Sequence, residues 1–430
     1  MNPHLTLRRS IAAVRMSATL DVNQQVVAAR QAGQDVLHLG FGQSPFPVHE
    51  TIQRSLGQHA DKNMYLPSAG LAPLRSAALD YFSARLGFAA DGYTCMVGSG
   101  SKELIFAVQL AVAGDLLMPV PSWVSYAPQV IMTDDRVIKV PTADSRHIAA
   151  EQLDRTIAAA RREGKHPTKL ILNYPNNPTG LSLDTTALEE IAAVCRTHGL
   201  VVISDEIYGL VDFRGNHRSI AAFYPENTVI TTGLSKHLSL GGYRIGFAMV
   251  PTAQPALFDA LLCIASEIWS AVSAPAQYAA VSACSGHREL EQYIASCTAI
   301  HQLITAYVRD RLSSFGVAYP ALHGAFYLYP DFAPFREALA ERGVTTSDQL
   351  AADLLTTARV ATLPGTAFGD EPETLTLRLA TCDFNGQSAL AYYHAHPDCT
   401  AQALVHACCD EIRRACDCME AYFTRPTSIA

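Results

Sequence analysis

The 430-residue sequence lacks the marks of several large classes of protein. Its 32 basic residues are outnumbered by 40 acidic ones, for a net charge of −8. No basic run stands out either, which argues against a nucleic-acid-binding surface. No apolar segment is long enough to span a bilayer. Arg8 and Arg9 are followed by no uninterrupted apolar core, so we expect no secretory signal and a place in the reducing cytoplasm.

The eleven cysteines lack the paired two-residue spacing of structural zinc sites. Cysteines and histidines do gather near the C-terminus, at His394, His396, Cys399, His406, Cys408, Cys409, Cys416 and Cys418. Of these, Cys408 falls with Ile412, Ala415 and Met419 on an apolar stripe of helical spacing. Free cysteine packs as a small hydrophobe, so we expect thiols of a helix core and surface, and no bound metal.

Apolar residues, in contrast, are abundant and follow alternating helix and strand patterns. They make up 49% of the chain, enough for a large core and for two or three domains. Helical patterns cover Lys102 to Ala113 and residues 186–198, the second capped near Asp184 and stopped by Gly199. Apolar strand patterns lie at 114–120, 169–174, 200–204 and 228–232. Short apolar strands separated by helices predict a largely parallel sheet wrapped on both faces.

The pattern changes after about Gln302. The stretches GAFYLYPDF, RVATLP and TLTLRLAT resemble strands, and TTSDQLAADLLTTA resembles a helix, which indicates a second, smaller α+β domain. We assign residues 49–300 to a large domain, and residues 1–48 with 301–430 to a small one. Residues 386–405 show no clear period and are interpreted as an irregular insertion.

Polar residues follow several of the predicted strands. PNNPTG, Asp205 and Lys236 all stand at strand exits, the edge of a parallel sheet where ligands bind. A lysine there can form an imine with an aldehyde cofactor, and a carboxylate can keep the nitrogen of a pyridine ring protonated. Singly, Asp205 could be a helix cap and Lys236 a solvated charge. Their agreement in order and place favours one shared site.

Further polar residues near these positions suit a phosphorylated pyridine cofactor. Ser235 and Arg244, with Gly241 and Gly242 between them, could hold a phosphate by hydroxyl, charge and close backbone approach. Tyr208, three residues after the aspartate, could donate to a ring oxygen.

With these stretches in view, the chain resembles the class I/II, fold-type-I aminotransferases that use pyridoxal phosphate. The resemblance runs from about Val36 to Arg378 and is carried by NNPTG, SDEIYG, GLSKHLSLGGYRIG, TLRLA, GSGSKELIF, PSWVSY, GAFYLYPDF and LPGTAF. The most similar group is the bacterial aspartate and prephenate aminotransferases. The resemblance implies an α/β fold in which a mostly parallel, seven-stranded sheet lies between helices, beside a smaller α+β domain. It also implies a homodimer with shared active sites.

The resemblance also assigns roles to residues. Lys236 would form the Schiff base with the cofactor and later move a proton, Asp205 would pair with the ring nitrogen, and Tyr208 and Asn177 would contact the ring hydroxyl. The phosphate would be bound by Ser101, Ser235, Arg244 and Lys102, and by Tyr65 from the neighbouring subunit. Trp123 would stack on the ring. Arg378 would hold the substrate carboxylate, with Gly42, Asn177 and Trp123 also at the substrate. The Val120–Pro121 and Asn177–Pro178 bonds would be cis.

The chain departs from the family pattern at three places. Gly233 stands where a small polar residue is usual, which puts one phosphate contact in doubt. GFGQSPFPV replaces a common Gly-x-Pro-Asp-Phe pattern at the substrate mouth, and the segment after Phe384 has no counterpart. The identity of the substrate is therefore open.

The implied reaction moves an amino group between an α-amino acid and a 2-oxo acid. The alternative is an enzyme of the same fold and cofactor that carries out elimination, cyclisation, decarboxylation or oxidation, because all of these start from the same bound amino acid. A non-catalytic regulator of this fold would need a DNA-binding domain ahead of Val36, where we expect none. Lys102 has two interpretations: it binds a distal carboxylate of the substrate, or it only neutralises the cofactor phosphate.

Overall fold

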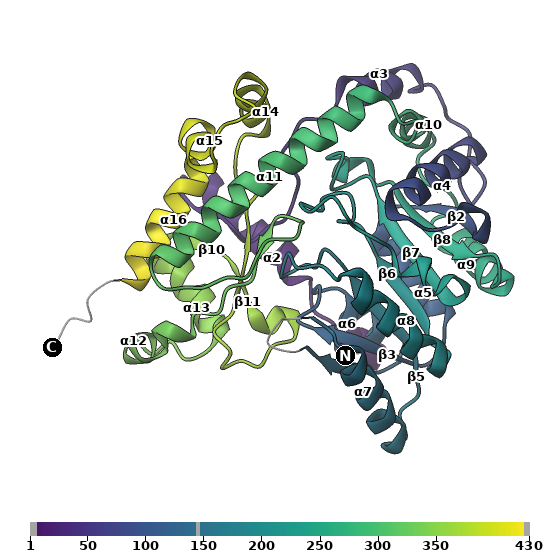
Figure 1. Cartoon of the computed structure of the whole chain (residues 1–430), viewed down its shortest axis with the longest axis horizontal. Helices are drawn as coiled ribbons and strands as arrows, with labels where there is room; N and C mark the ends of the chain where they lie inside the picture. The colour runs from purple at the N-terminus through teal and green to yellow at the C-terminus, as the bar shows by residue number, and fades with distance from the viewer. Residues whose placement is uncertain (1–6, 143–146, 425–430) are drawn as a thin grey trace, which may run out of the picture.

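The computed structural model describes residues 7–142 and 147–424 and is built around one seven-stranded sheet (Figure 1). The strand order is β2-β8-β7-β6-β5-β3-β4, with strands at Tyr93–Gly98 (β2), Asp115–Val120 (β3), Val137–Pro141 (β4), Pro167–Asn173 (β5), Val201–Asp205 (β6), Thr228–Gly233 (β7) and Gly246–Pro251 (β8). Strands β3 to β7 are mutually parallel, and β8 runs antiparallel to both of its neighbours. The predicted, mostly parallel seven-stranded sheet is confirmed.

Helices cover both faces of this sheet because its strands are apolar on both sides. On β5, Leu170 and Leu172 belong to a core with α7 (Ala150–Arg162) and α8 (Thr185–His198). Ile171 points the other way, into a core with α5 (Ser101–Ala111), α6 (Tyr126–Met132) and α9 (Pro255–Ile268). The expected caps of α8 are present, because Asp184 accepts a hydrogen bond from the Ala187 N–H and Gly199 adopts the left-handed conformation.

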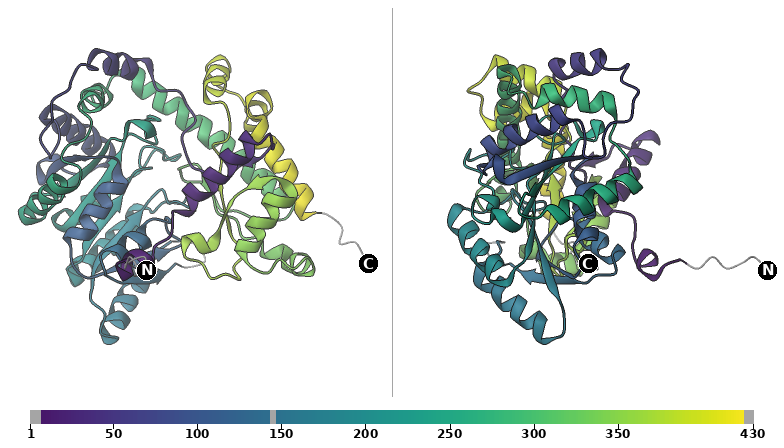
Figure 2. Two further views of the ribbon diagram at one scale, coloured as in Figure 1. Left: turned by 180° about the vertical axis from the view of Figure 1, so that it is seen from behind. Right: turned by 90° about the vertical axis from the view of Figure 1, so that its right-hand side faces the viewer.

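Most of the remaining elements form a second, smaller layer of strands and helices beside the large sheet (Figures 1 and 2). Strands Tyr327–Leu328 (β9), Leu363–Pro364 (β11) and Leu377–Ala380 (β12) pair in the order β11-β12-β9, and Leu37–His38 (β1) pairs with Val360–Ala361 (β10). Helices there are Ala18–Gln31 (α2), Arg336–Glu341 (α12), Ser347–Asp353 (α13), Gly386–Ala395 (α14), Ala401–Cys408 (α15) and Asp410–Phe423 (α16). The short helix Arg9–Ala12 (α1) precedes them.

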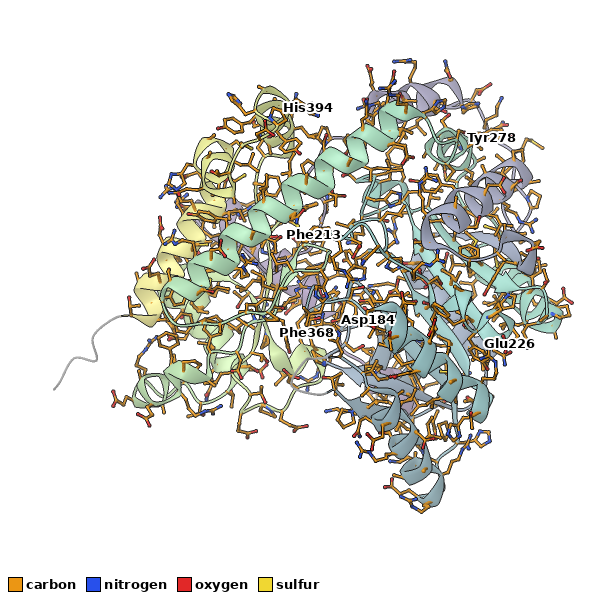
Figure 3. The ribbon with its side chains drawn as sticks, viewed as in Figure 1. Asp184, Phe213, Glu226, Tyr278, Phe368 and His394 are labelled. Carbon is orange, nitrogen blue, oxygen red and sulfur yellow. The ribbon has the colours of Figure 1, made fainter. Side chains whose placement is uncertain are left out.

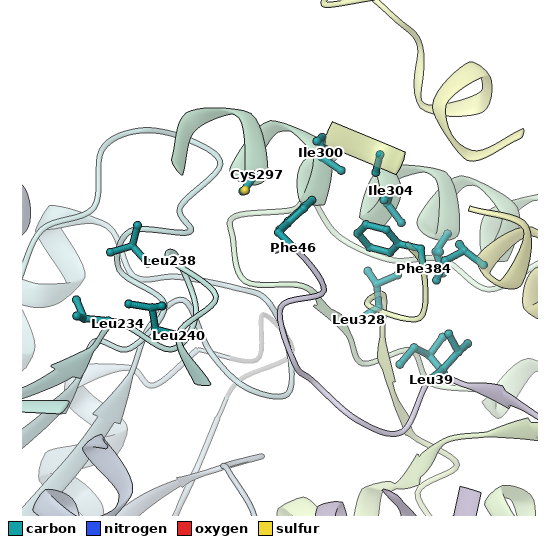
Figure 4. Close-up of a cluster of buried hydrophobic side chains, with 14 of the residues drawn as sticks. Leu39, Phe46, Leu234, Leu238, Leu240, Cys297, Ile300, Ile304, Leu328 and Phe384 are labelled. Carbon is teal, nitrogen blue, oxygen red and sulfur yellow. The ribbon is translucent and has the colours of Figure 1, made fainter. Parts of the chain in front are cut away.

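One long helix, Arg288–Ser314 (α11), runs across both parts of the molecule (Figure 1). It starts near Glu50–Gln58 (α3), Ala72–Leu86 (α4) and Ala274–Ala283 (α10), and it ends beside α16. Figure 4 shows Cys297, Ile300 and Ile304 of α11 in one buried cluster with Phe46 and Phe384. The predicted domain boundary at residue 300 falls inside this helix, and the division into two domains stays a prediction.

The structure corrects the interpretation of residues 386–405 as an irregular insertion. The segment forms α14 and α15, each started by a side-chain cap: Asn385 accepts from the Ser388 N–H and Thr400 from the Ala403 N–H. Both helices pack on α11. The apolar period was obscured because each helix is short and buries only a few side chains, such as Leu390 and Leu404.

Two smaller expectations also need correction. Cys408 does not share a helix with Ile412 and Met419, because α15 ends at Cys408 and α16 begins at Asp410. The Val120–Pro121 bond is cis as expected, but the second cis proline bond follows Tyr174 rather than Asn177. Figure 3 places the side chains along all these elements, with His394 on the edge formed by α14.

Two features are absent from the described part of the chain. Within residues 7–142 and 147–424, no helix is both long and apolar enough to cross a membrane. No group of three or more histidine, cysteine, aspartate or glutamate side chains in those same residues is placed to hold a metal ion.

A close backbone approach joins the sheet to the start of α5. Gly246, the first residue of β8, lies against Gly100 and Ser101 so tightly that a Cβ atom would overlap the backbone of both. Only glycine allows this contact. The contact places the N-terminus of α5 at the end of the sheet that Lys236 follows.

We expect Gly246→Ala to lower the free energy of unfolding by about 1–3 kcal/mol or more, because overpacking against backbone cannot be relieved by a rotamer change. Calorimetric melting is the measurement. Gly242→Ala is the matched control, because a Cβ atom at Gly242 meets no atom within 4 Å. Equal melting temperatures for the two variants would contradict the importance of this contact.

Candidate active site

A cavity of about 440 Å³ opens at the carboxyl ends of the parallel strands. Its wall comes from the strand exits, from the start of α5, from the N-terminal segment and from the smaller sheet. Of the predicted site residues, the cavity is lined by Gly42, Ser101, Lys102, Trp123, Asn177, Asp205, Tyr208, Ser235, Lys236, Arg244 and Arg378. Tyr65 is the exception: it lies outside the cavity, and its side chain is 92% exposed.

Lys236 follows β7 and points its amine into the cavity. Its Nζ donates to the carbonyl of Gly42 at 2.8 Å, and the rings of Tyr208 and Phe326 lie 5.5 and 5.6 Å away. Burial lowers the pKa of Lys236 to about 8. A larger fraction of this amine is therefore neutral near pH 7 than for an exposed lysine, which a nucleophilic amine requires.

Asp205 ends β6 and is 3% exposed. Burial raises the pKa of its carboxyl to about 6, although a hydrogen bond from Tyr126 acts in the opposite direction. The Tyr126 hydroxyl donates to Oδ2 at 2.6 Å, and the Ile207 N–H donates to Oδ1 at 3.3 Å. These donors favour the charged carboxylate, so Asp205 can present a negative charge to a cationic group in the cavity.

Tyr208 lies across from a second tyrosine that sequence reasoning did not single out. The hydroxyls of Tyr208 and Tyr327 are 2.7 Å apart. Gly42 lies directly on Tyr327, whose hydroxyl occupies the position that a Cβ atom on residue 42 would take. Glycine at 42 is therefore required for the N-terminal segment to approach Lys236 and Tyr327 together.

Arg378, on β12, is fully buried at 0% exposure. Its guanidinium donates to the Gly40 carbonyl at 2.5 Å and to Asn177 Oδ1 at 3.3 Å, and its Nε has no partner. No carboxylate among the described residues forms an ion pair with it. Because a buried cation without an anion is costly, Arg378 is well suited to bind the carboxylate of a ligand.

Asn177 is held in place by Asn173, another residue that the sequence did not single out. The Asn173 side chain accepts from the Asn177 N–H at 2.7 Å and donates to the carbonyl of Asp205 at 2.9 Å. One amide therefore links the PNNPTG turn to the end of β6, which fixes Asn177 relative to Asp205.

The opposite end of the cavity has the donors of an anion site. Ser101 begins α5, where backbone N–H groups are free, and Ser235 and Arg244 line the same end. The guanidinium of Arg244 donates to the carbonyls of Ser99 and Gly241 at 2.7 and 3.1 Å. Lys102 adds a second cation 5.0 Å from the centroid of the Trp123 ring, and burial lowers its pKa.

The close approach of two strands explains why residue 233 is a glycine. It pairs with Gly246 across β7 and β8, and a Cβ atom on it would lie 2.8 Å from the carbonyl oxygen of Ile245. A serine in this place would clash with the backbone unless the strands moved apart. The close spacing of β7 and β8 therefore explains why residue 233 has no polar side chain.

Sequence reasoning assigned no role to part of the lining: Ser17, Thr19, Leu20, Phe41, Gln43, Tyr126, Asn173, Ile207 and Tyr327. Ser17, Thr19 and Leu20 lie outside every stretch that carries the family resemblance, and only the folded chain brings them to the strand exits. Tyr126 was within reach of sequence analysis, because it lies three residues after Trp123 at the start of a helix. Asn173 likewise ends the strand that leads into PNNPTG.

The arrangement fits pyridoxal phosphate on three observations. The phosphate would lie at Ser101, Ser235 and Arg244, a cradle of hydroxyls and charge at a helix N-terminus. The ring nitrogen would face Asp205 and the aldehyde would face Lys236. The unpaired Nε of Arg378 remains available for a substrate carboxylate.

Comparison with known proteins agrees with this geometry. Residues 34–385 match the family model described as aminotransferase class I and II. The chain is 33% identical over 389 residues to the aspartate aminotransferase of Geobacillus stearothermophilus, covering 88% of this chain and 95% of that protein. It is 30% identical to the asparagine–oxo-acid transaminase of Streptococcus mutans, covering 87% and 95%.

The fold is similar to that of a solved aspartate aminotransferase from Thermus thermophilus with maleate. That match has a TM-score of 0.81 at 24% identity and covers 96% of this chain and 100% of the other. At this identity the likeness concerns the fold.

We expect Tyr126→Phe to raise the pKa of Asp205 by about one to two units, because a hydrogen bond to a charged group is worth about 1.5–3 kcal/mol. The measurement is the affinity of the cofactor-free protein for pyridoxal phosphate across pH. Protonation of Asp205 removes its charge, so affinity should fall as pH drops through its pKa, and at a higher pH in the variant. Tyr224→Phe, another buried tyrosine outside the cavity, is the control. An unchanged midpoint in Tyr126→Phe would refute this role.

Proposed function

Because the chain belongs to the class I and II aminotransferases, we propose that it uses pyridoxal phosphate, bound through Lys236, to move amino groups between α-amino acids and 2-oxo acids. Amino-group transfer is the activity of this family. The observation that carries the cofactor assignment is the placement of Lys236, Asp205 and Arg378 around one cavity. Each supplies what a different part of a loaded active site needs: a nucleophilic amine, an anion and a cation.

When bound, pyridoxal phosphate withdraws electrons from the α-carbon of an amino acid attached to it. The protein's part is binding, orientation and proton movement. Asp205 keeps its negative charge toward the ring nitrogen, Arg378 orients the α-carboxylate, and Trp123 flanks the ring. Lys236, once its amine is free, moves the proton at the α-carbon. Gly42 and the N-terminal segment cover the substrate side.

A single-turnover reaction tests the chemistry. Loaded enzyme mixed with an amino acid, and with no oxo acid present, should yield pyridoxamine phosphate and one equivalent of oxo acid. Lys236→Ala should abolish this and also the attachment of cofactor trapped by borohydride, because no amine remains to form the bond or move the proton. Recovery of unchanged cofactor with an eliminated or cyclised product would favour the alternative chemistry. Label trapped on Lys102 would refute the role of Lys236.

We further propose a homodimer in which each subunit completes the site of the other. Met64 and Tyr65 are 76% and 92% exposed. A surface groove beside the phosphate end shares Lys102 and Arg244 with the cavity. Its apolar side is formed by Phe106, Ile264, Ile268 and Trp269. The exposed segment of a second copy matches this groove in polarity and would bring a phenol to the phosphate.

Mixing two inactive variants, Lys236→Ala and Tyr65→Ala, should restore about a quarter of wild-type activity, because half of randomly mixed dimers are hybrids and each hybrid has one intact site of two. Subunit exchange followed by an activity assay is the measurement. Each variant mixed with itself is the control. A fully active monomer in sedimentation, or no recovery on mixing, would contradict shared sites.

For the substrate, we propose an amino acid whose side chain is acidic or polar. Lys102 lines the cavity, and none of the described carboxylates forms an ion pair with it. If it binds a distal carboxylate, Lys102→Ala should raise KM for dicarboxylic substrates about tenfold or more, the worth of a charged hydrogen bond. KM for monocarboxylic substrates should stay the same. An equal loss for both would show that Lys102 serves the cofactor phosphate.

The division into a large domain, residues 49–300, and a small one, residues 1–48 with 301–430, is likewise proposed. The seven-stranded sheet and the three-stranded sheet, which both contribute residues to the wall of the cavity, support it. A reducing compartment such as the cytoplasm is proposed because all eleven cysteines are free thiols.

A further inference from the structure

A second buried carboxyl stands directly behind Asp205. Glu206 is the next residue of the chain, and its side chain is 0% exposed. Successive residues at the end of a strand point to opposite sides. Asp205 accordingly lines the cavity, whereas Glu206 does not. A negative charge on Glu206 opposes the ionisation of Asp205.

Glu206 is held by four side-chain groups on its own side of the strand. Its Oε1 accepts from the hydroxyls of Ser219 at 2.5 Å, Ser204 at 2.8 Å and Tyr174 at 3.2 Å. Its Oε2 faces Nε2 of His217 at 2.9 Å. The His217 ring also stacks on Tyr174, with centroids 5.3 Å apart. Three hydroxyls and one imidazole nitrogen therefore surround the two oxygens of the Glu206 side chain.

His217 is the basic member of this group. Among the described residues, it is the one basic side chain within 4 Å of the Glu206 carboxylate. The other titratable groups that face Glu206 are Tyr174, Tyr93 and Asp205, all of them acids. The negative charge of Glu206 is one of the causes that raise the pKa of Asp205, after the larger effect of burial.

We propose that His217 is a positioning residue for the transfer reaction. By donating Nε2–H to Glu206, it partly offsets the negative charge of Glu206, which then opposes the ionisation of Asp205 less. Asp205 therefore stays anionic toward the ring nitrogen of the cofactor. This rests on the proposed function, because it concerns the partner of Asp205. Glu206 lies outside the cavity, so its charge acts more strongly on Asp205 than on a ring held within the cavity.

The test compares two cofactors rather than activity alone. Pyridoxal phosphate and its analogue with a carbon–hydrogen group in place of the ring nitrogen fill the same space, but only the first can pair with an anionic Asp205. The ratio of their Kd values for the cofactor-free protein therefore reports the charge of Asp205. Simple damage to the site would weaken both cofactors and leave the ratio unchanged.

His217→Phe keeps the aromatic stacking on Tyr174 and removes the donor. We expect it to reduce the preference for pyridoxal phosphate about tenfold, the equivalent of one pKa unit at Asp205. The preference should also require a higher pH than in the wild type. His217→Gln retains an N–H group and should restore the preference. An unchanged ratio in His217→Phe would overturn the proposal.

Glu206→Gln provides a second, independent test, because it removes the negative charge that His217 offsets. The double variant Glu206→Gln/His217→Phe should recover the wild-type preference, since the two effects are coupled. If His217→Phe does not fold, Glu206→Gln alone decides: the proposal requires a preference at least as large as that of the wild type, and a smaller one overturns it. A wild-type protein that binds both cofactors equally would instead refute the role of Asp205 in the proposed function.

Discussion

Three buried, charged side chains, Asp205, Lys236 and Arg378, surround one cavity. The rest of the structure depends on supplying hydrogen-bonding partners that offset the free-energy cost of burying these charges. Removing a charge from water costs several kcal/mol unless protein groups replace the lost hydration. Here the replacements are the Tyr126 hydroxyl for Asp205, the Gly42 carbonyl for Lys236 and the Gly40 carbonyl for Arg378. The compensation is partial, because the pKa of Asp205 is still raised and the Nε of Arg378 has no partner. A ligand that carries both charges would complete it.

The partners of these charges come from distant parts of the chain, so the site exists only when the seven-stranded sheet and the three-stranded sheet lie beside the same cavity. Gly40 and Gly42 belong to the N-terminal segment, and Arg378 lies in the smaller sheet. The buried cluster in Figure 4 connects these parts through α11 and includes Leu39 and Phe46 from the same N-terminal segment. Hydrophobic burial, which has no direction of its own, thus brings directional hydrogen-bonding groups to within 3 Å of the charges.

Glycine contacts set the remaining distances. Gly246 allows β8 to touch the start of α5, and Gly42 allows the N-terminal segment to lie on Tyr327. Behind the strand exit, the network around Glu206 ties four side chains to the residue next to Asp205. Together these contacts fix the position of the cavity wall, which a site lined by charges of both signs requires.

The sequence by itself determined the class of fold and much of the site, because both are local signals. Apolar runs and caps predict the strands and helices around β5, β6 and α8, and the carboxyl ends of parallel strands lie at one edge whatever the details of packing. Lys236, Asp205 and Asn177 are therefore expected at one place on the strength of the amino-acid pattern alone. The short helices α14 and α15 were not predicted from the sequence, because each buries too few side chains to show a helical period.

Only the tertiary structure decided which residues from elsewhere in the chain contact Lys236, Asp205 and Asn177 or line the cavity with them. The contact of Tyr327 with Gly42 and the lining by Ser17, Thr19 and Leu20 depend on contacts between distant segments, and no spacing in the sequence encodes them. The position of Tyr65 is likewise a property of the folded chain, in which it is exposed and lies outside the cavity. The pairing of Glu206 with His217 likewise follows from the turn that brings the chain back behind β6, where burial forces a carboxylate to find donors.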